Sequence, residues 1–244
     1  MKTKFLNIGL LLAMSLTVVF TSCDNEPERP RITITAENVG GNTDNVAVVK
    51  VGNNRWGDYG THSFKIITEV PFQNNSFTVQ LPRTMRADYL SPYLFFGGTP
   101  NPIDSAMNLS DENVRWSILA FSGYSKNDNY ISFFSYRQST VNTHTESFWV
   151  YADRNVKATT NTIIYLQSIV DNNPIFLEFV VDLNFRRGWN IMYNISEFDF
   201  AEQKFTEIIT TERPADVNLQ WIFGWHLEND IRSFSSPIRP FLVR

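Results

Sequence analysis

The residue types that most often carry chemistry are sparse and scattered along this chain. Its three histidines, His62, His144 and His226, lie far apart, and none has a second metal ligand at the spacing that zinc sites use. The sequence also contains no Gly-x-Ser-x-Gly elbow and no glycine-rich phosphate loop. We therefore predict neither a metal site nor a cofactor.

Pairs of carboxylates offer a second kind of chemistry. Glycoside hydrolysis needs two carboxyl groups about 5–10 Å apart. Glu178 and Asp182 share one face of a predicted strand, and Asp199 and Glu202 lie in a predicted turn. A solvated strand face explains such pairs equally well, so we predict that the protein is not an enzyme and keep a glycoside hydrolase as an alternative.

Aromatic residues supply a third kind of chemistry, because their faces give large, rigid contact areas with a polar end. Trp116, Trp189 and Trp221 alternate in phase with aliphatic neighbours, which is typical of a core. The remaining aromatic residues in predicted turns and at strand ends are candidates for stacking on a sugar ring. These candidates are Trp56, Trp225, Tyr124, Tyr130 and Tyr136.

The chain begins with a segment that has the pattern of an export signal. Lys2 and Lys4 precede an apolar stretch, Phe5 to Phe20, which is short for a membrane span and suits a signal peptide. Thr21 and Ser22 then lead into Cys23, the one cysteine of the chain, in a pattern that resembles a bacterial lipobox. The resemblance implies cleavage before Cys23 and a lipid anchor on its sulfur. An ordinary signal peptide with an incidental cysteine is the alternative.

Residues 23–30 contain acidic residues and prolines without hydrophobic periodicity, and they predict an extended tether. An acidic run directly after the cysteine also resembles the surface-export signal of Bacteroidetes lipoproteins. We accordingly expect residues 1–22 to be a signal peptide and residues 31–244 to form a single domain. The expected location is the cell outer membrane, surface-exposed through the lipid anchor, with the periplasmic face as the alternative.

Charge and composition narrow the class of partner. The 244 residues carry a formal charge of −4, with 21 basic and 25 acidic side chains, and removal of Lys2 and Lys4 lowers the charge to −6. An acidic chain without a basic stripe argues against a nucleic-acid partner. The hydrophobic content of 43% is enough for a core, and a single cysteine excludes a fold held by internal disulfides.

Alternation of apolar and polar residues with a period of two recurs through the body and predicts an all-β fold. The clearest case is Ile175, Leu177, Phe179, Val181 and Leu183. About a dozen short strands result, separated by turn residues such as those of Lys126–Asn129 and Asp171–Pro174. We predict an antiparallel β-sandwich, with a closed β-barrel or two tandem small sandwiches as alternatives, and we interpret residues 97–113 as a loop.

Several segments together resemble a group of small Bacteroides-type cell-envelope lipoproteins of unknown function. They are Asn75–Pro82 followed by Tyr89-Leu90, Val150–Val156, Leu183–Tyr193, and Thr210–Pro214 before Leu219–Trp221. The resemblance implies location and class, and carries no catalytic residues. Asp104-Ser105-Ala106 also resembles the O-glycosylation site of Bacteroidetes proteins, which makes Ser105 a candidate for modification.

These observations lead to one functional expectation with two alternatives. We expect a non-enzymatic binding module that is anchored to a membrane through Cys23 and contacts a glycan or an envelope protein. The first alternative is a glycan-binding accessory of a polysaccharide-uptake system. The second is a surface adhesion or structural component, which would need an exposed strand edge or apolar patch.

Overall fold

A computed structural model describes residues 31–53, 64–94, 102–167, 174–199, 201–202 and 204–224; for 102, 164–167, 174 and 175 it describes the backbone alone. The chain's contacts group residues 31–244 into one compact unit. Cys23, His62 and His226 lie outside the described residues, as do the candidate stacking residues Trp56 and Trp225. Of the described helices, neither has the length and apolar composition that crossing a bilayer requires.

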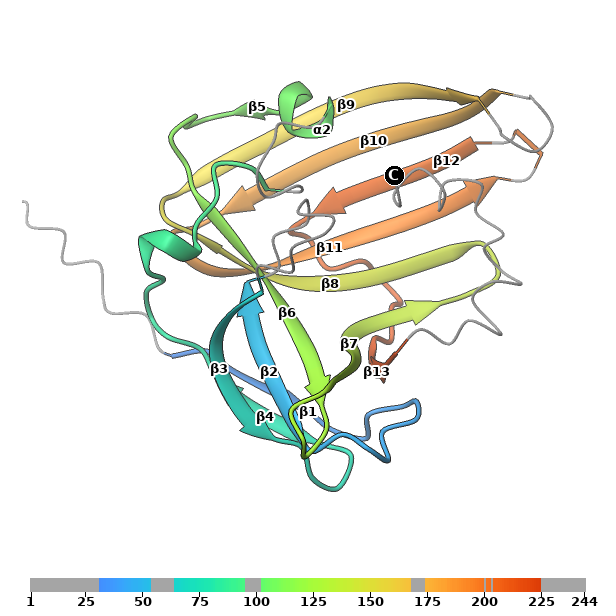
Figure 1. The fold of residues 1–244 in the computed structure, drawn as a ribbon. Coiled ribbons are helices and arrows are strands. Elements are labelled where there is room, and N and C mark those ends of the chain that lie inside the picture. The colour runs from blue at the N-terminus through green and yellow to red at the C-terminus, as the bar shows by residue number, and fades with distance from the viewer. Residues whose placement is uncertain are drawn as a thin grey trace, which may run out of the picture. The chain divides into compact units, whose positions relative to one another are not determined.

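The fold is all-β, as predicted, with 13 described strands and two short helical segments (Figure 1). The strands are β1 (Thr33–Ala36), β2 (Val48–Asn53), β3 (Lys65–Pro71), β4 (Phe77–Gln80), β5 (Asn108–Leu109), β6 (Trp116–Tyr124), β7 (Tyr130–Ser139), β8 (Thr143–Ala152), β9 (Val156–Gln167), β10 (Pro174–Phe185), β11 (Gly188–Asp199), β12 (Lys204–Thr210) and β13 (Gln220–Phe223). The helical segments are the 3₁₀ turn η1 (Ala87–Tyr89) and α2 (Pro102–Ala106).

Two sheets form the sandwich. β1 and β4 pair in a small antiparallel sheet, and the other eleven strands form a large sheet in the order β3-β2-β6-β7-β8-β11-β12-β10-β9-β5, with β13 beside β7. The described part of the large sheet runs from β3 to β5 without closing, so the barrel alternative is wrong.

The large sheet is mixed, which corrects the prediction of a purely antiparallel fold. β12 lies between β10 and β11, where it pairs antiparallel with β11 and parallel with β10. β9 and β10 pair antiparallel from Val156↔Phe185 to Gln167↔Pro174. The expected loop at 97–113 is also corrected in part, since α2 and β5 lie within it and β5 extends the sheet beside β9.

Each face of the large sheet carries its own core. The first face packs on the small sheet, and its buried residues, here called the first core, include Trp149, Trp189 and Trp221. The rings of Trp149 and Trp221 stack with centroids 5.5 Å apart and an interplanar angle of 6°. Trp189 and Trp221 are both buried, which confirms their interpretation from the sequence as core residues.

The second face carries the second core, which contains Trp116, Val150, Leu183 and Phe185. Trp116 is 1% exposed and packs edge-on against Phe185, with ring centroids 5.5 Å apart. Successive side chains of β6 and β8 alternate between the first and second cores, so both strands are buried on both sides. The centre of the large sheet is therefore packed on both faces.

Candidate functional site

The β6–β7 hairpin brings two of the candidate stacking residues together. Tyr124 ends β6, Tyr130 begins β7, and the two residues pair directly across the hairpin. Their rings meet edge to face, with centroids 5.7 Å apart and an interplanar angle of 70°. Tyr130 is 57% exposed, so one ring of this tyrosine pair is open to solvent.

The tip of the hairpin is built by its turn residues. The backbone N–H of Asp128 donates to the carbonyl of Ser125 at 3.1 Å, and Asp128 has a positive φ of 61°. The Ser125 hydroxyl oxygen accepts the N–H groups of both Asn127 and Asn129 at 3.2 Å. Asp and Asn adopt this left-handed conformation more readily than most residues, so the sequence Lys126–Asn129 forms the turn that it predicts.

A β-bulge sets the direction of Tyr130. The register of β6 and β7 shifts between Gly123 and Tyr124, where Gly123 faces Ser132 and Tyr124 faces Tyr130. Ile131 is therefore the extra residue on β7. An extra residue in a strand moves the side chains beyond it to the opposite face of the sheet. The bulge therefore places the Tyr130 side chain on the second face, on the same side as Tyr124.

Charged groups hold the Tyr124 ring in place. Lys50 of β2 places its Nζ atom 4.5 Å from the centre of the Tyr124 ring. The same atom lies 2.6 Å from an Asp128 carboxylate oxygen and 3.6 Å from one of Glu69. The hydrogen bond to Asp128 raises the pKa of Lys50, so its charge is retained over the cation–π contact.

The resulting surface has the parts that a sugar site uses. Desolvation and the neighbouring Tyr124 raise the pKa of Tyr130, so its phenol stays protonated and can donate a hydrogen bond. The side chains of Asp128 and Glu69 are 73% and 50% exposed and can accept hydrogen bonds from hydroxyl groups. We call Lys50, Glu69, Tyr124, Asp128 and Tyr130 the tyrosine surface.

The third tyrosine of the predicted group lies elsewhere. Tyr136 is half-buried against the first core, with its ring centre 5.3 Å from that of Trp221 and 6.2 Å from that of Trp149. The sequence grouped Tyr136 with Tyr124 and Tyr130 by proximity along the chain. In the structure, Tyr136 belongs to the packing on the opposite face of the sheet.

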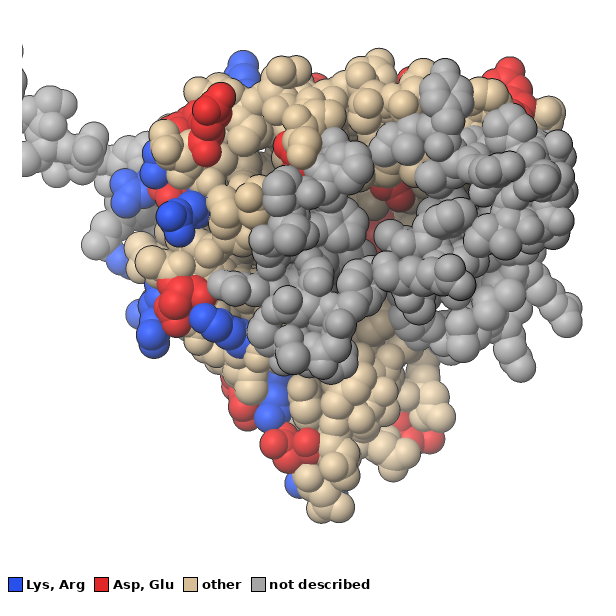
Figure 2. Space-filling view, turned by 45° about the horizontal axis from the view of Figure 1, so that its top comes forward, with Lys and Arg blue, Asp and Glu red and all other residues tan. Residues whose placement is uncertain are grey.

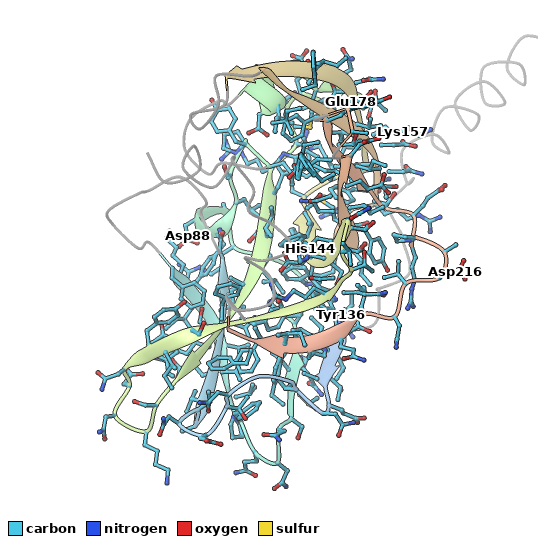
Figure 3. All side chains as sticks on the ribbon, turned by 90° about the vertical axis from the view of Figure 1, so that its right-hand side faces the viewer. Asp88, Tyr136, His144, Lys157, Glu178 and Asp216 are labelled. Carbon is cyan, nitrogen blue, oxygen red and sulfur yellow. The ribbon has the colours of Figure 1, made fainter. Side chains whose placement is uncertain are left out.

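A second polar set crosses the second face of the large sheet. Ser139, His144, Ser196 and Glu207 follow one another across β7, β8, β11 and β12. In Figure 3, His144 lies on one side of this sheet, and Lys157 and Glu178 lie on the other. This row contains the one histidine among the described residues.

The geometry around His144 does not form a nucleophilic triad. Ser139 Oγ lies 2.8 Å from His144 Nδ1, whereas the Glu146 carboxylate oxygen lies 3.8 Å from His144 Nε2. The second distance exceeds hydrogen-bond length, so Glu146 does not orient the ring as a triad carboxylate does. Ser139 is moreover exposed at the end of β7. The arrangement is that of a hairpin stabilised by side-chain contacts.

Within the same row, Glu207 is the most perturbed carboxyl group of the described residues. It faces the same side of β12 as the buried Phe205 and Ile209 and pairs with Phe179 of β10. Burial raises the pKa of Glu207 to about 7. In the neighbouring strand β11, the buried Oδ1 atom of Asn194 accepts no hydrogen bond from the described residues.

The predicted carboxylate pairs do not converge. Glu178 and Asp182 stand four residues apart on one strand, which corresponds to about 13 Å, and Lys204 holds Glu178 in an ion pair of 2.7 Å. Asp199 accepts the backbone N–H groups of Ala201 and Glu202, at 2.8 and 3.1 Å, and so shapes a turn. Glu178 and Asp182 are therefore too far apart for glycoside hydrolysis, and Asp199 is engaged in its turn.

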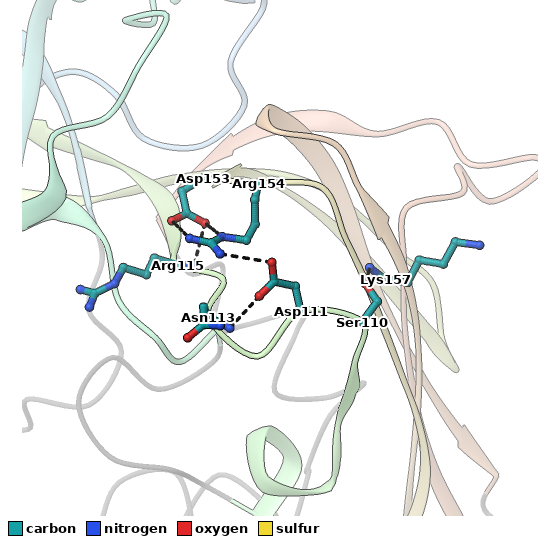
Figure 4. A network of polar contacts seen from close by, with 7 residues as sticks. All are labelled: Ser110, Asp111, Asn113, Arg115, Asp153, Arg154 and Lys157. Atoms are coloured by element: carbon teal, nitrogen blue, oxygen red, sulfur yellow. Dashed lines mark hydrogen bonds and ion pairs between the residues drawn. The ribbon is translucent and has the colours of Figure 1, made fainter. Parts of the chain in front are cut away.

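The ion pair at the β8–β9 turn is a structural network (Figure 4). Arg154 contacts Asp153 through two nitrogen atoms, at 3.1 and 3.3 Å, and Asp111 through a third at 3.2 Å. Asp111 also accepts the N–H of Asn113, which together with Arg154 lowers the pKa of Asp111. The network ties the segment after β5 to the β8–β9 turn.

Ser105 lies in α2 rather than in a loop, and its side chain is exposed. The preceding residue, Asp104, is held by the structure, because its Oδ1 atom accepts the backbone N–H of Leu94 at 3.1 Å. Ser105 is accessible, and its modification stays a prediction.

The described charged residues and potential metal ligands form no further candidate site. In Figure 2, the described lysine and arginine side chains are interspersed with acidic ones and form no broad basic patch on the face in view. The described residues contain no group of three or more potential metal ligands. Comparison with known protein families, curated proteins and solved structures found no match to this chain.

Proposed function

We propose that this protein is a non-enzymatic cell-envelope lipoprotein that is anchored through Cys23 and binds a glycan on the tyrosine surface. The observation that carries the proposal is the exposed ring of Tyr130, which meets the Tyr124 ring edge to face at 70° beside exposed carboxylates. A sugar ring presents an apolar face to an aromatic ring and hydroxyl groups around its rim. The tyrosine surface is complementary to both.

Pre-organisation supports this assignment. Tyr124 is fixed by Lys50, and the turn that holds Asp128 is closed by backbone and Ser125 hydrogen bonds. A surface that is ordered before binding loses less conformational entropy when a ligand arrives. Tyrosine adds to this advantage because it supplies contact area with only two side-chain torsions.

The binding test is a glycan array probed with the full chain and three variants. Tyr130→Ala removes the exposed ring and is expected to abolish binding, whereas Tyr130→Phe retains the ring and is expected to weaken binding only by the loss of one hydroxyl group. Val141→Ala is the matched control, because Val141 is 75% exposed at the tip of the next hairpin, β7–β8. An array without signal, or equal signal from Tyr130→Ala, would contradict the proposal.

The anchor is tested separately. Cells that express the chain are labelled with palmitate, and label is expected on the wild type and absent from Cys23→Ala. Protease treatment of intact cells then distinguishes the outer surface, where the protein is cleaved, from the periplasmic face, where it is protected. An unlabelled wild-type protein would exclude the lipid anchor and leave the sugar-binding test unaffected.

A further inference from the structure

The two ends of the large sheet are protected very differently. β3 forms one end, and its sequence contains Lys65, Glu69 and Pro71. Its pairing with β2 is irregular between Val51 and Gly52, and the Tyr89 hydroxyl donates to the Ile66 carbonyl at 3.0 Å. Charges, proline, an irregular register and side-chain hydrogen bonds are the means by which natural proteins keep an edge strand from pairing.

α2 contacts part of β9, near the other end, but the described part of β9 from Thr160 onward shows none of the protections of β3. β5 pairs with β9 at Ala158 and Thr159 alone, so no described strand covers the outer edge of β9 from Thr160 to Gln167 (Figure 1). The sequence Thr160-Asn161-Thr162-Ile163-Ile164-Tyr165-Leu166-Gln167 has no charge, no proline and no glycine. Threonine, isoleucine and tyrosine are strong strand formers.

The backbone groups available on this edge follow from the contacts of β5. The Lys157 carbonyl accepts the N–H of Ser110 at 2.9 Å, and the Lys157 N–H donates to the Ser110 hydroxyl oxygen at 2.9 Å. Both polar groups of Lys157 therefore point away from β10. Because alternate residues of a strand point the same way, Asn161, Ile163 and Tyr165 also direct their N–H and C=O groups outward.

We propose that this edge pairs antiparallel with the same edge of a second copy of the chain, about a two-fold axis at Ile163. In this register Ile163 faces Ile163 of the second copy, and Asn161 faces Tyr165 in both directions. Three pairs of outward-facing residues exchange hydrogen bonds, and no like charges oppose one another. The large sheet then continues from one protomer into the other.

Exposure of Ile163 favours a second copy over an unrelated peptide. Its side chain is 51% exposed on the first face, beyond the small sheet. A two-fold axis at this residue covers the isoleucine of each copy with that of the other. Such an interface is closed, because each edge is used once, and the assembly stops at the dimer.

Sedimentation velocity of the purified full chain in density-matched detergent tests the proposal, and a dimer is expected at micromolar concentration. Ile163→Pro removes an outward N–H without removing a hydrogen bond to β10, and Ile163→Lys places a charge on the edge. Both variants are expected to be monomeric with unchanged circular dichroism. Ile191→Lys is the matched control and should remain dimeric, because Ile191 is a 41% exposed isoleucine on the same face of the interior strand β11.

Hydrogen exchange supplies a second measurement that depends on the register. The amides of Asn161, Ile163 and Tyr165 are expected to be protected in the wild type and to exchange rapidly in Ile163→Lys. A monomeric wild type overturns the proposal, as does a dimer that survives both Ile163 variants. Loss of the dimer in Ile191→Lys, or assembly beyond the dimer, places the interface elsewhere and also overturns it.

Discussion

The carboxyl group of Glu207 provides a quantitative test of the burial that the large sheet imposes. It lies on the second face of β12, on the same side as Phe205 and Ile209 and beside Phe179. Desolvation raises its pKa from an ordinary 4.5 to about 7. The substitution Glu207→Gln removes the charge and nearly preserves the shape of the side chain.

The sign of the effect follows from proton binding. Between pH 4.5 and pH 7 the folded chain holds a proton on Glu207 that the unfolded chain has lost, so the free energy of unfolding falls as the pH rises through this range. Each pKa unit corresponds to about 1.4 kcal/mol, so a shift from 4.5 to about 7 costs the wild type about 3 kcal/mol above pH 7. Below pH 4.5 this cost is absent. Glu207→Gln lacks this cost at every pH.

Urea denaturation monitored by tryptophan fluorescence over a series of pH values measures this difference. We expect Glu207→Gln and the wild type to have similar free energies of unfolding at acidic pH, and the variant to be the more stable one above neutrality. Glu197→Gln, which removes an exposed carboxyl group from the neighbouring strand β11, serves as the control. A difference between Glu207→Gln and the wild type that stays constant with pH would refute the assignment of a desolvated, proton-binding Glu207.

Two substitutions in the first core test the packing. Trp221→Ala removes the ring that stacks on Trp149 and is expected to cost about 3–5 kcal/mol of unfolding free energy, measured by urea denaturation; a loss below about 1 kcal/mol would contradict the packing. Gly123→Ala would place a Cβ atom 2.5 Å from the Phe223 ring and 3.2 Å from the Phe134 ring. Such overpacking is expected to cost about 1–3 kcal/mol, and an unchanged melting temperature would show that the two rings can move apart.

The sequence predicts the strands well where one face is buried and the other is solvated. β10 is the clearest example, because Leu177, Phe179, Val181 and Leu183 alternate with less buried residues, and the structure has this alternation. β8 is harder to recognise, since its residues Trp149 to Ala152 are buried on both faces and alternation is lost. Double burial leaves a continuous apolar run, here Phe148 to Ala152, and periodicity alone does not distinguish such a run from a buried helix segment.

The order of the strands in the sheet could not be predicted from the sequence. The position of β12 between β10 and β11 depends on which edges remain available once the sheet assembles. Hydrophobic alternation specifies the face that a side chain occupies and leaves the identity of the neighbouring strand open. The parallel pairing of β10 with β12 therefore emerges only in the structure.

One extra residue in β7 explains why the grouping of the three tyrosines from the sequence was wrong for Tyr136. Tyr130 and Tyr136 are six positions apart and would share a face in a regular strand. The extra residue at Ile131 reverses that relation, so Tyr130 joins Tyr124 while Tyr136 enters the first core. A bulge of this kind has no reliable sequence signal, and proximity along the chain grouped all three residues.

The most direct test of sugar binding is a titration of the protein, carrying isotope-labelled tyrosine rings, with the glycan that the array selects. We expect the ring signals of Tyr124 and Tyr130 to shift along one saturation curve, while those of Tyr136, packed against Trp149 and Trp221, stay in place. A glycan that binds without moving the signals of Tyr124 and Tyr130 would contradict the central claim.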